Sequence, residues 1–152
     1  MSDRREEALA FIESHRVMTL ATHGTRGPWA SAVFYVNEGF TLTFLSSPRS
    51  RHASDLAADS RCGAAVHEDC SDWRQIRGLQ LEGNVRALSG GEQRRAIMRY
   101  AQKFPVTHLD QAPAVIRAAL ERVAWYEFVP HRCFFVDNTH GFGHRDEVLL
   151  PR

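Results

Sequence analysis

Residues 79–88 restrict the possible folds of this chain more than any other segment, because apolar and polar side chains alternate along them. One face would carry Leu79, Leu81, Val85 and Ala87, and the other Gln80, Glu82, Asn84 and Arg86. This period of two predicts a strand with one covered and one polar face, which is typical of antiparallel sheets. Gly83 interrupts the pattern and predicts a bulge or a bend.

Five further segments carry strand patterns, and residues 29–36 among them are almost entirely apolar. Such a run predicts a strand that is covered on both faces. The last region, residues 124–136, has strand character on both sides of Pro130, where we expect it to break or bend. The remaining strands are expected at residues 17–22, 41–45 and 62–67.

Helical patterns lie between these strands. One helix is expected at the start of the chain, and a short one directly after residues 46–52. Ser89 and Glu92 have the spacing of a capping box and predict the start of a third helix, which would stop at Pro105. A fourth follows Pro113. About six short antiparallel strands with peripheral helices predict an α+β fold built on a small barrel.

Length and composition limit the class of protein. The chain has 152 residues, the usual size of one domain, so we expect residues 1–152 to form a single domain. No long uncharged apolar run is present, and the acidic start is unlike a secretory signal. The three cysteines have no framework spacing, which favours free thiols and a cytoplasmic protein. A net charge of +1 without a basic run gives nucleic-acid binding no support.

Residues 46–52 concentrate groups that bind anions between a predicted strand and a predicted helix. A helix N-terminus offers free N–H groups and a partial positive charge, and arginine can engage phosphate oxygens in a bidentate way. Pro48 suits the first helical position. The segment contains Ser46, Ser47, Arg49, Ser50, Arg51 and His52. These residues alone fit equally a phosphate site or a capped helix with a solvated basic turn.

The order of several short motifs resembles the pyridoxamine-5′-phosphate-oxidase-like family of FMN-binding split barrels. The motifs are residues 19–22, 27–29, 31–36, 46–52 and 76–83. Residues 99–100, 103–106 and 135–143 resemble an uncharacterised bacterial branch of that superfamily. The resemblance covers nearly the whole chain and implies a split β-barrel that binds FMN.

The resemblance also implies which residues hold the cofactor. A strand would lie along the isoalloxazine ring, a turn would hold the phosphate, and Gln80 would add a polar side chain near the flavin. The ring strand would supply Ser31, Ala32, Val33 and Phe34, and the turn Ser46, Ser47, Ser50, Arg51 and His52. Family members often carry lysine at the place of His52, so the affinity for phosphate is expected to be lower or dependent on pH. Such proteins are typically homodimers in which residues 138–142 of the partner complete each site.

The resulting hypothesis is a flavin-dependent oxidoreductase of unknown substrate. Vitamin B6 oxidation is not predicted, because true pyridoxamine-phosphate oxidases have a longer, substrate-binding C-terminus. The first alternative is a haem-binding or haem-degrading relative, with His131, His140 or His144 as an axial ligand. The second is a flavin store or sensor that catalyses nothing. No metal motif is present, and Trp73 fits either a cap on a ligand ring or an interface residue.

Overall fold

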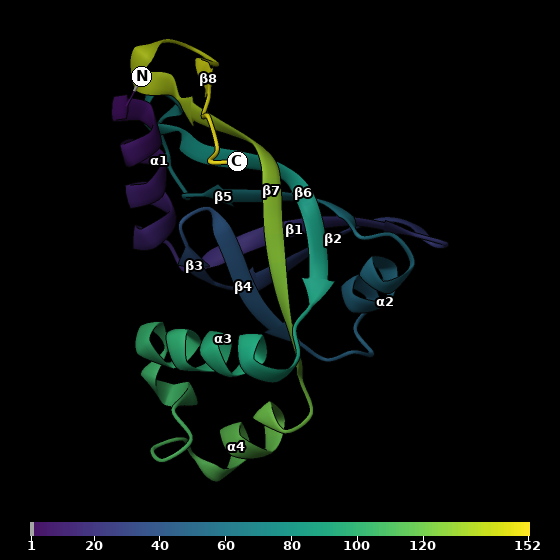
Figure 1. The fold of residues 1–152 in the computed structure, drawn as a ribbon. Coiled ribbons are helices and arrows are strands. Elements are labelled where there is room, and N and C mark those ends of the chain that lie inside the picture. Colours follow the sequence, from purple (N-terminus) through teal and green to yellow (C-terminus); the bar gives the residue numbers. More distant parts are fainter. Residues whose placement is uncertain (1) are drawn as a thin grey trace.

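An antiparallel sheet that curls on itself forms the centre of the computed structural model (Figure 1). The structure describes residues 2–152, with side chains from residue 4 onward. Within this range the strand order is β2-β1-β5-β6-β7-β4-β3, and an eighth strand, β8, pairs with β7. The strands are β1 (Val17–Gly24), β2 (Gly27–Phe34), β3 (Val36–Glu38), β4 (Thr41–Ser46), β5 (Arg61–His67), β6 (Arg77–Ala87), β7 (Ala124–Asp137) and β8 (Arg145–Glu147).

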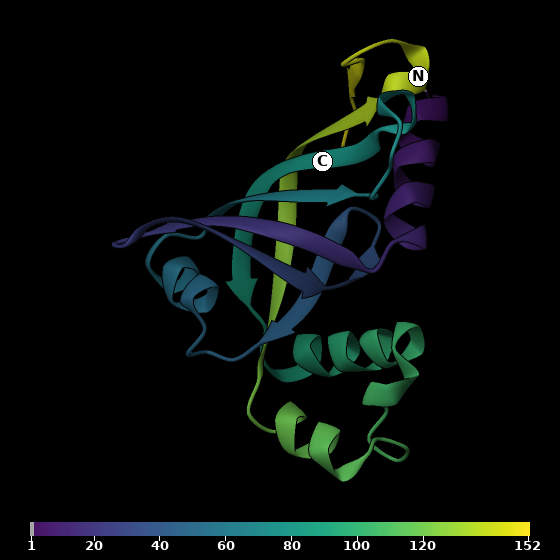
Figure 2. The ribbon, with the colours of Figure 1, turned by 180° about the vertical axis from the view of Figure 1, so that it is seen from behind.

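Helices cover the sheet at its periphery. Figure 2 shows α2 beside the projecting β1–β2 hairpin, while α3 and α4 lie together at one end of the molecule and α1 packs at its side. The α-helices are α1 (Ser2–Ser14), α2 (Arg51–Ala58), α3 (Gly90–Lys103) and α4 (Ala114–Leu120). Three short 3₁₀ segments are η1 (Trp73–Gln75), η2 (Pro105–Thr107) and η3 (Asn138–His140). No helix in residues 2–152 is long and apolar enough to cross a membrane.

The core fills the inner face of the curled sheet. Leu20, Leu42, Phe44 and Phe128 are fully buried there, and the apolar face of α1 packs against them. A second, smaller cluster joins α3 to the sheet; it is made of Val36, Leu88, Ala96, Tyr100 and Trp125. The inner face is therefore apolar along most of its length, and any polar side chain on it stands out.

The α+β split-barrel prediction is confirmed. All six expected strands are present, and β3 and β8, each three residues long, are additional. The ladder between β6 and β7 shifts register between Glu82 and Gly83, but the extra residue is His131 of β7, so the bulge lies on the partner strand beside Gly83 and not at Gly83 itself. Pro130 lies opposite Gly83, and β7 runs through it without interruption. The strand therefore bends at Pro130 and is not broken, because the bulge accommodates a residue that has no N–H.

The prediction that residues 29–36 are covered on both faces is wrong for the single chain. The strand, β2, lies at the edge of the sheet, and its side chains are half-buried or exposed. Trp29 is 43% exposed and Phe34 is 55% exposed. Cover on the outer face is partial: Phe34 meets Phe104 edge to face with ring centroids 5.5 Å apart, and only Tyr35 and Val36, beyond the end of β2, are buried.

The predicted start of a helix after Ser89 is confirmed, but the capping box is not formed. Ser89 is the N-cap of α3, its side chain accepts no capping hydrogen bond, and Glu92 pairs with Arg86 at 2.8 Å. Arg86, six residues earlier at the end of β6, therefore competes for the glutamate. The helix start predicted at Pro48 is wrong. Helix α2 begins at Arg51, so Pro48 lies in the preceding turn and not at the first helical position.

Candidate functional site

The turn between β4 and α2 brings polar groups to the inner side of the barrel. Along β4 the side chains of Leu42 and Phe44 are buried, and the alternation of the strand gives Ser46 the same orientation. A reverse turn follows, closed by the N–H of Ser50 donating to the Ser47 carbonyl at 3.0 Å. The Ser50 hydroxyl then caps α2 by accepting from the N–H of Ala53 at 3.3 Å. The preceding N–H groups of the first helical turn have no acceptor within the helix.

Three side chains of this turn form one hydrogen-bonded cluster. The Ser46 hydroxyl lies 2.7 Å from Nε2 of His52 and 3.1 Å from the Ser50 hydroxyl, which is itself 3.3 Å from the same nitrogen. Burial lowers the pKa of the His52 imidazole, and the nearby Asp55 carboxylate opposes this only in part. The imidazole is therefore neutral at neutral pH, so the cluster presents hydroxyls and a neutral ring.

Arg51 supplies the positive charge beside this cluster. Its guanidinium carbon lies 4.3 Å from the centre of the Trp29 ring, and Nη2 donates to the Arg26 carbonyl at 3.1 Å. Its Nε is buried and has no hydrogen-bond partner among the described residues. A buried donor without an acceptor is costly, and an anion at this place would satisfy it.

A buried carboxylate fixes the helix that carries these residues. Asp55 of α2 accepts a hydrogen bond from the Thr22 hydroxyl of β1 at 3.0 Å, and both side chains are 4% exposed. The approach is close: a Cβ added at Gly24 would lie 2.0 Å from Oδ1 of Asp55. The lack of a side chain at Gly24 thus lets α2 settle on the end of β1, which sets the position of the turn.

The remaining predicted site residues are divided between the two faces of the sheet. Ser31 and Val33 are paired with Leu20 and Met18, whose buried side chains mark the inner face. Ala32 and Phe34 point outward, as does Gln80, which alternates with buried leucines on β6 and accepts a hydrogen bond from Arg145 at 3.3 Å. Ser47 and Arg49 are exposed at the tip of the turn. The structure therefore groups Ser46, Ser50, Arg51 and His52, but not Gln80.

Small side chains cover the outer face between Gln80 and the edge of the sheet. The strand registers place Ala32, Thr19, Ala65 and Gln80 in one row across β2, β1, β5 and β6. Ala32 and Gln80 are exposed, and the two residues between them are half-buried. This row gives the outer face a shallow surface, on the side of the sheet opposite to the turn.

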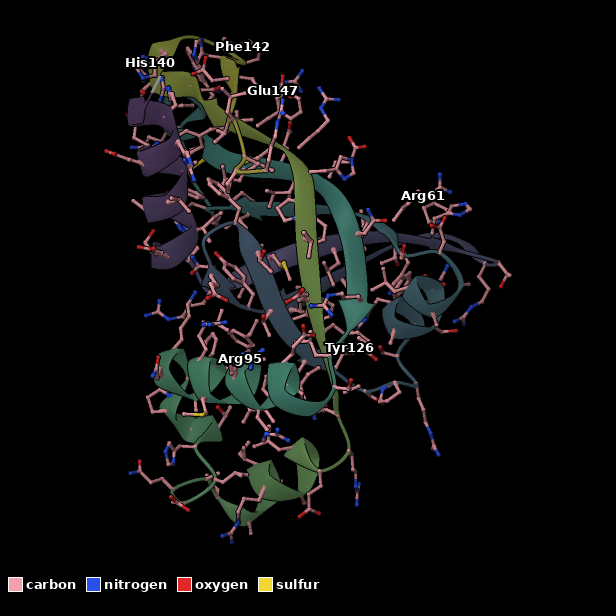
Figure 3. The ribbon with its side chains drawn as sticks, in the orientation of Figure 1. Arg61, Arg95, Tyr126, His140, Phe142 and Glu147 are labelled. Carbon is pink, nitrogen blue, oxygen red and sulfur yellow. The ribbon has the colours of Figure 1, made fainter. Side chains whose placement is uncertain are left out.

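The histidines considered as haem ligands each face a carboxylate. His131 lies 3.0 Å from Glu82. His144 lies 2.9 Å from Asp146, and His140 lies 3.7 Å from Asp137. Figure 3 places His140, with Phe142, near the start of α1 and away from α2. Across residues 4–152 the structure contains no group of three or more His, Cys, Asp or Glu side chains that could hold a metal ion.

Two cysteines and a tryptophan complete the comparison with the sequence. Cys62 and Cys133 are buried, and burial raises the pKa of both thiols to about 12, which agrees with a core role for Cys62. Trp73 is 51% exposed and meets Phe142 edge to face at 5.6 Å. It therefore lies at the η1–η3 end of the molecule, not beside the turn.

Sequence reasoning missed the residues that hold the turn in place. Trp29 was expected as part of a strand covered on both faces, and Asp55 and Thr22 were not singled out. Nothing in their local sequence marks them, because each role depends on a residue from another element. Only the register of β1 with β2 and the packing of α2 bring these groups together.

Comparisons with known proteins agree with this fold. Residues 5–128 match the family model described as pyridoxamine 5′-phosphate oxidase. A UPF0306 protein of Klebsiella pneumoniae is 32% identical over 135 residues, which cover 88% of this chain and 84% of the relative. A haem-binding protein from Mycobacterium smegmatis superposes with a TM-score of 0.71 at 27% identity, over 95% of this chain and 57% of that one. An FAD-binding protein from Mesorhizobium loti gives 0.66 at 15% identity, over 84% and 90% of the two chains. The chain therefore belongs to the pyridoxamine 5′-phosphate oxidase family of split barrels.

Proposed function

We propose that this protein binds FMN, with the phosphate in the turn of residues 46–52, and that it acts as a flavin-dependent oxidoreductase on a substrate not yet identified. The buried, partnerless Nε of Arg51 beside the Ser46–Ser50–His52 cluster carries the proposal. In a solvated basic turn the arginine nitrogens would contact water, whereas Nε of Arg51 is buried.

The residues present fit a phosphate ester. Arg51 would contribute one charge and the free Nε–H, the Ser46 and Ser50 hydroxyls would donate to phosphate oxygens, and the first N–H groups of α2 point toward the same place. His52 would act as a neutral hydrogen-bonding partner. With one half-buried arginine as its main cation, the site predicts weaker phosphate binding than a site that also holds a lysine.

The edge position of β2 fits the flavin ring. Strand β2 pairs with β1 on one side only, so the opposite edge offers backbone N–H and C=O groups in the described chain. The small Ser31 and Ala32 on this strand would let a flat ring approach those groups. Bound FMN supplies the electron-transfer chemistry, and the protein binds and orients it.

A homodimer would cover the surfaces that the single chain leaves open. Phe34 on the outer side of β2 is 55% exposed, and the adjoining row of small side chains is shallow enough for close packing. Large exposed apolar side chains beside such a surface are typical of protein interfaces. We therefore include a second copy of this chain in the proposal, with a flavin site at each end of the interface.

Haem is the alternative ligand, and the structural similarity to the Mycobacterium smegmatis haem-binding protein favours it. The visible absorption spectrum of the purified protein, as isolated and after addition of FMN and of haemin, separates the two. A flavin spectrum or stoichiometric quenching of FMN fluorescence supports the proposal. A haem spectrum that disappears after replacement of His131, His140 or His144 by alanine contradicts it.

Catalysis is tested separately from binding. Reduction of the bound flavin by NADH or NADPH above the rate measured with free FMN would support an oxidoreductase. A protein that binds FMN tightly but is reduced by neither donor, and that passes electrons to no candidate acceptor, would favour a flavin store or sensor.

The phosphate site is tested by Arg51→Ala. We expect this change to weaken FMN roughly 10- to 100-fold, because one charged hydrogen-bonding group is lost, and to change riboflavin affinity less than about threefold. Arg49→Ala is the matched control, since Arg49 lies in the same turn but is exposed. Fluorescence titration with both flavins measures the effect. Equal losses for FMN and riboflavin would show that Arg51 does not meet the phosphate.

A further inference from the structure

Among the described residues, Trp29 is the aromatic side chain whose ring lies against Arg51, and the flavin proposal assigns it no role. Its partner on β1 is Thr22, whose buried hydroxyl bonds Asp55 of α2. Directly paired residues of an antiparallel ladder share a face, so the indole lies on the side where α2 packs. The Arg51 guanidinium carbon lies over its ring, 4.3 Å from the ring centroid.

This contact is unlike the second arginine–tryptophan pair of the protein. Arg74 lies 6.0 Å from the Trp73 ring and is held by Asp72 through hydrogen bonds of 2.8 to 3.2 Å. Arg51 has no such carboxylate: its contacts in the described chain are the Trp29 ring and the Arg26 carbonyl. A ring face attracts a guanidinium without neutralising it. The charge of Arg51 is thus oriented and still available.

The position of Trp29 along β2 adds a second argument. Trp29, Ser31 and Val33 follow one another on the inner face at every second residue. Ser31 belongs to the stretch proposed to lie along the flavin ring, and Arg51 to the turn proposed to hold the phosphate. Trp29 therefore stands between the two ends of the proposed ligand, where its ring can support one face of the guanidinium while phosphate oxygens accept from the in-plane N–H groups at the guanidinium edge.

We propose that Trp29 is a positioning residue that makes the site selective for phosphorylated flavin. The indole face holds the Arg51 guanidinium so that Nε–H points at the phosphate, and this inference rests on the FMN proposal. Without the indole, the arginine gains rotational freedom and must be ordered by the ligand, which weakens binding of FMN but not of riboflavin.

The test measures the ratio of riboflavin to FMN dissociation constants by flavin fluorescence in the full-length protein. We expect Trp29→Leu to lower this ratio about tenfold, and Trp29→Phe, which keeps a π face, to stay within about threefold of the wild type. Trp73→Leu is the matched control, because Trp73 is similarly exposed and also adjoins an arginine. Circular dichroism and thermal unfolding establish that each variant is folded.

A double-mutant cycle decides whether Trp29 acts through Arg51. In the Arg51→Ala background, Trp29→Leu is expected to leave the ratio unchanged, since the group that it positions is gone. Additive effects, or a wild-type ratio in Trp29→Leu, would overturn the inference while leaving FMN binding intact. If the Leu variant is unfolded, Trp29→Phe and Trp29→Tyr decide by the same ratio. A wild-type protein that binds neither flavin would overturn the proposed function and the inference together.

Discussion

His52 is the residue of the turn whose pKa is shifted by burial in the folded chain. Burial lowers the pKa of its imidazole in the folded chain, whereas the unfolded chain has the ordinary value of about 6.5. Below that value the unfolded state binds a proton that the folded state does not yet bind. The contribution of His52 to stability is therefore complete above about pH 7 and is lost as the pH falls through the folded pKa.

We expect His52→Gln to remove this pH dependence. In urea unfolding without ligand, the free energy of unfolding of the wild type should fall relative to that of the variant as the pH is lowered from 7.5 to 5.5. One proton limits the slope to about 1.4 kcal/mol per pH unit, and partial solvent exposure keeps it well below this limit. All other ionisable groups are common to both proteins, so their contributions cancel in the difference. Parallel stability curves would show that burial does not shift this imidazole.

At the scale of an element, the two N-cap serines are predicted to differ in how much they contribute to stability. Ser50 caps α2 through its hydroxyl and also bonds the Ser46 and His52 side chains, while Ser89 precedes α3 without a capping hydrogen bond. We expect Ser50→Ala to lower the free energy of unfolding by about 1 kcal/mol, and Ser89→Ala to change it by less than about 0.5 kcal/mol. Urea unfolding of the ligand-free variants measures both. A larger loss for Ser89→Ala would mean that the capping box forms in solution.

The packing of α2 against β1 gives a second prediction at the scale of an element. Gly24→Ala would place a methyl group against Asp55, so we expect a loss of about 1–3 kcal/mol in stability and weaker FMN binding, because the turn moves with the helix. Gly63→Ala on β5 is the matched control, since the nearest atom to an added Cβ lies 3.6 Å away. Thermal unfolding and FMN titration report the two effects. Wild-type behaviour of Gly24→Ala would show that α2 does not need this close approach.

At the scale of the whole molecule, the exposed outer face predicts self-association. Size-exclusion chromatography with light scattering should give twice the chain mass of 17.2 kDa for the wild type. Ala32→Arg places a charge in the middle of the outer face and is expected to yield a monomer that binds FMN poorly. Ala57→Arg is the control, because Ala57 is exposed on α2. A wild-type monomer at tens of micromolar would contradict the dimer and leave the exposure of Phe34 without an explanation.

Much of the molecule was determined by local sequence. The alternation of residues 79–88 specified a strand with one buried face, because a period of two acts over neighbouring residues. The bulge itself lies on β7 opposite Gly83, whose missing side chain lets Val129 and Pro130 approach closely. The sequence also showed that hydroxyl and basic side chains gather at residues 46–52 and that a helix follows, although it placed Pro48 at the first helical position where Ser50 is the cap.

Only the tertiary structure decided which of these groups meet. The strand order left β2 at the edge, so an apolar run that predicted burial became an exposed strand. Arg86 drew Glu92 away from Ser89, and the β1–β2 register with the seat of α2 brought Trp29 to Arg51. The pairing of β6 with β5 and of β5 with β1 put Gln80 on the face of the sheet opposite the turn. Apart from the Arg86–Glu92 pair, whose residues are six positions apart, these outcomes depend on contacts between segments distant in sequence. The relative position of such segments is fixed by packing and register and not by any local pattern of residues.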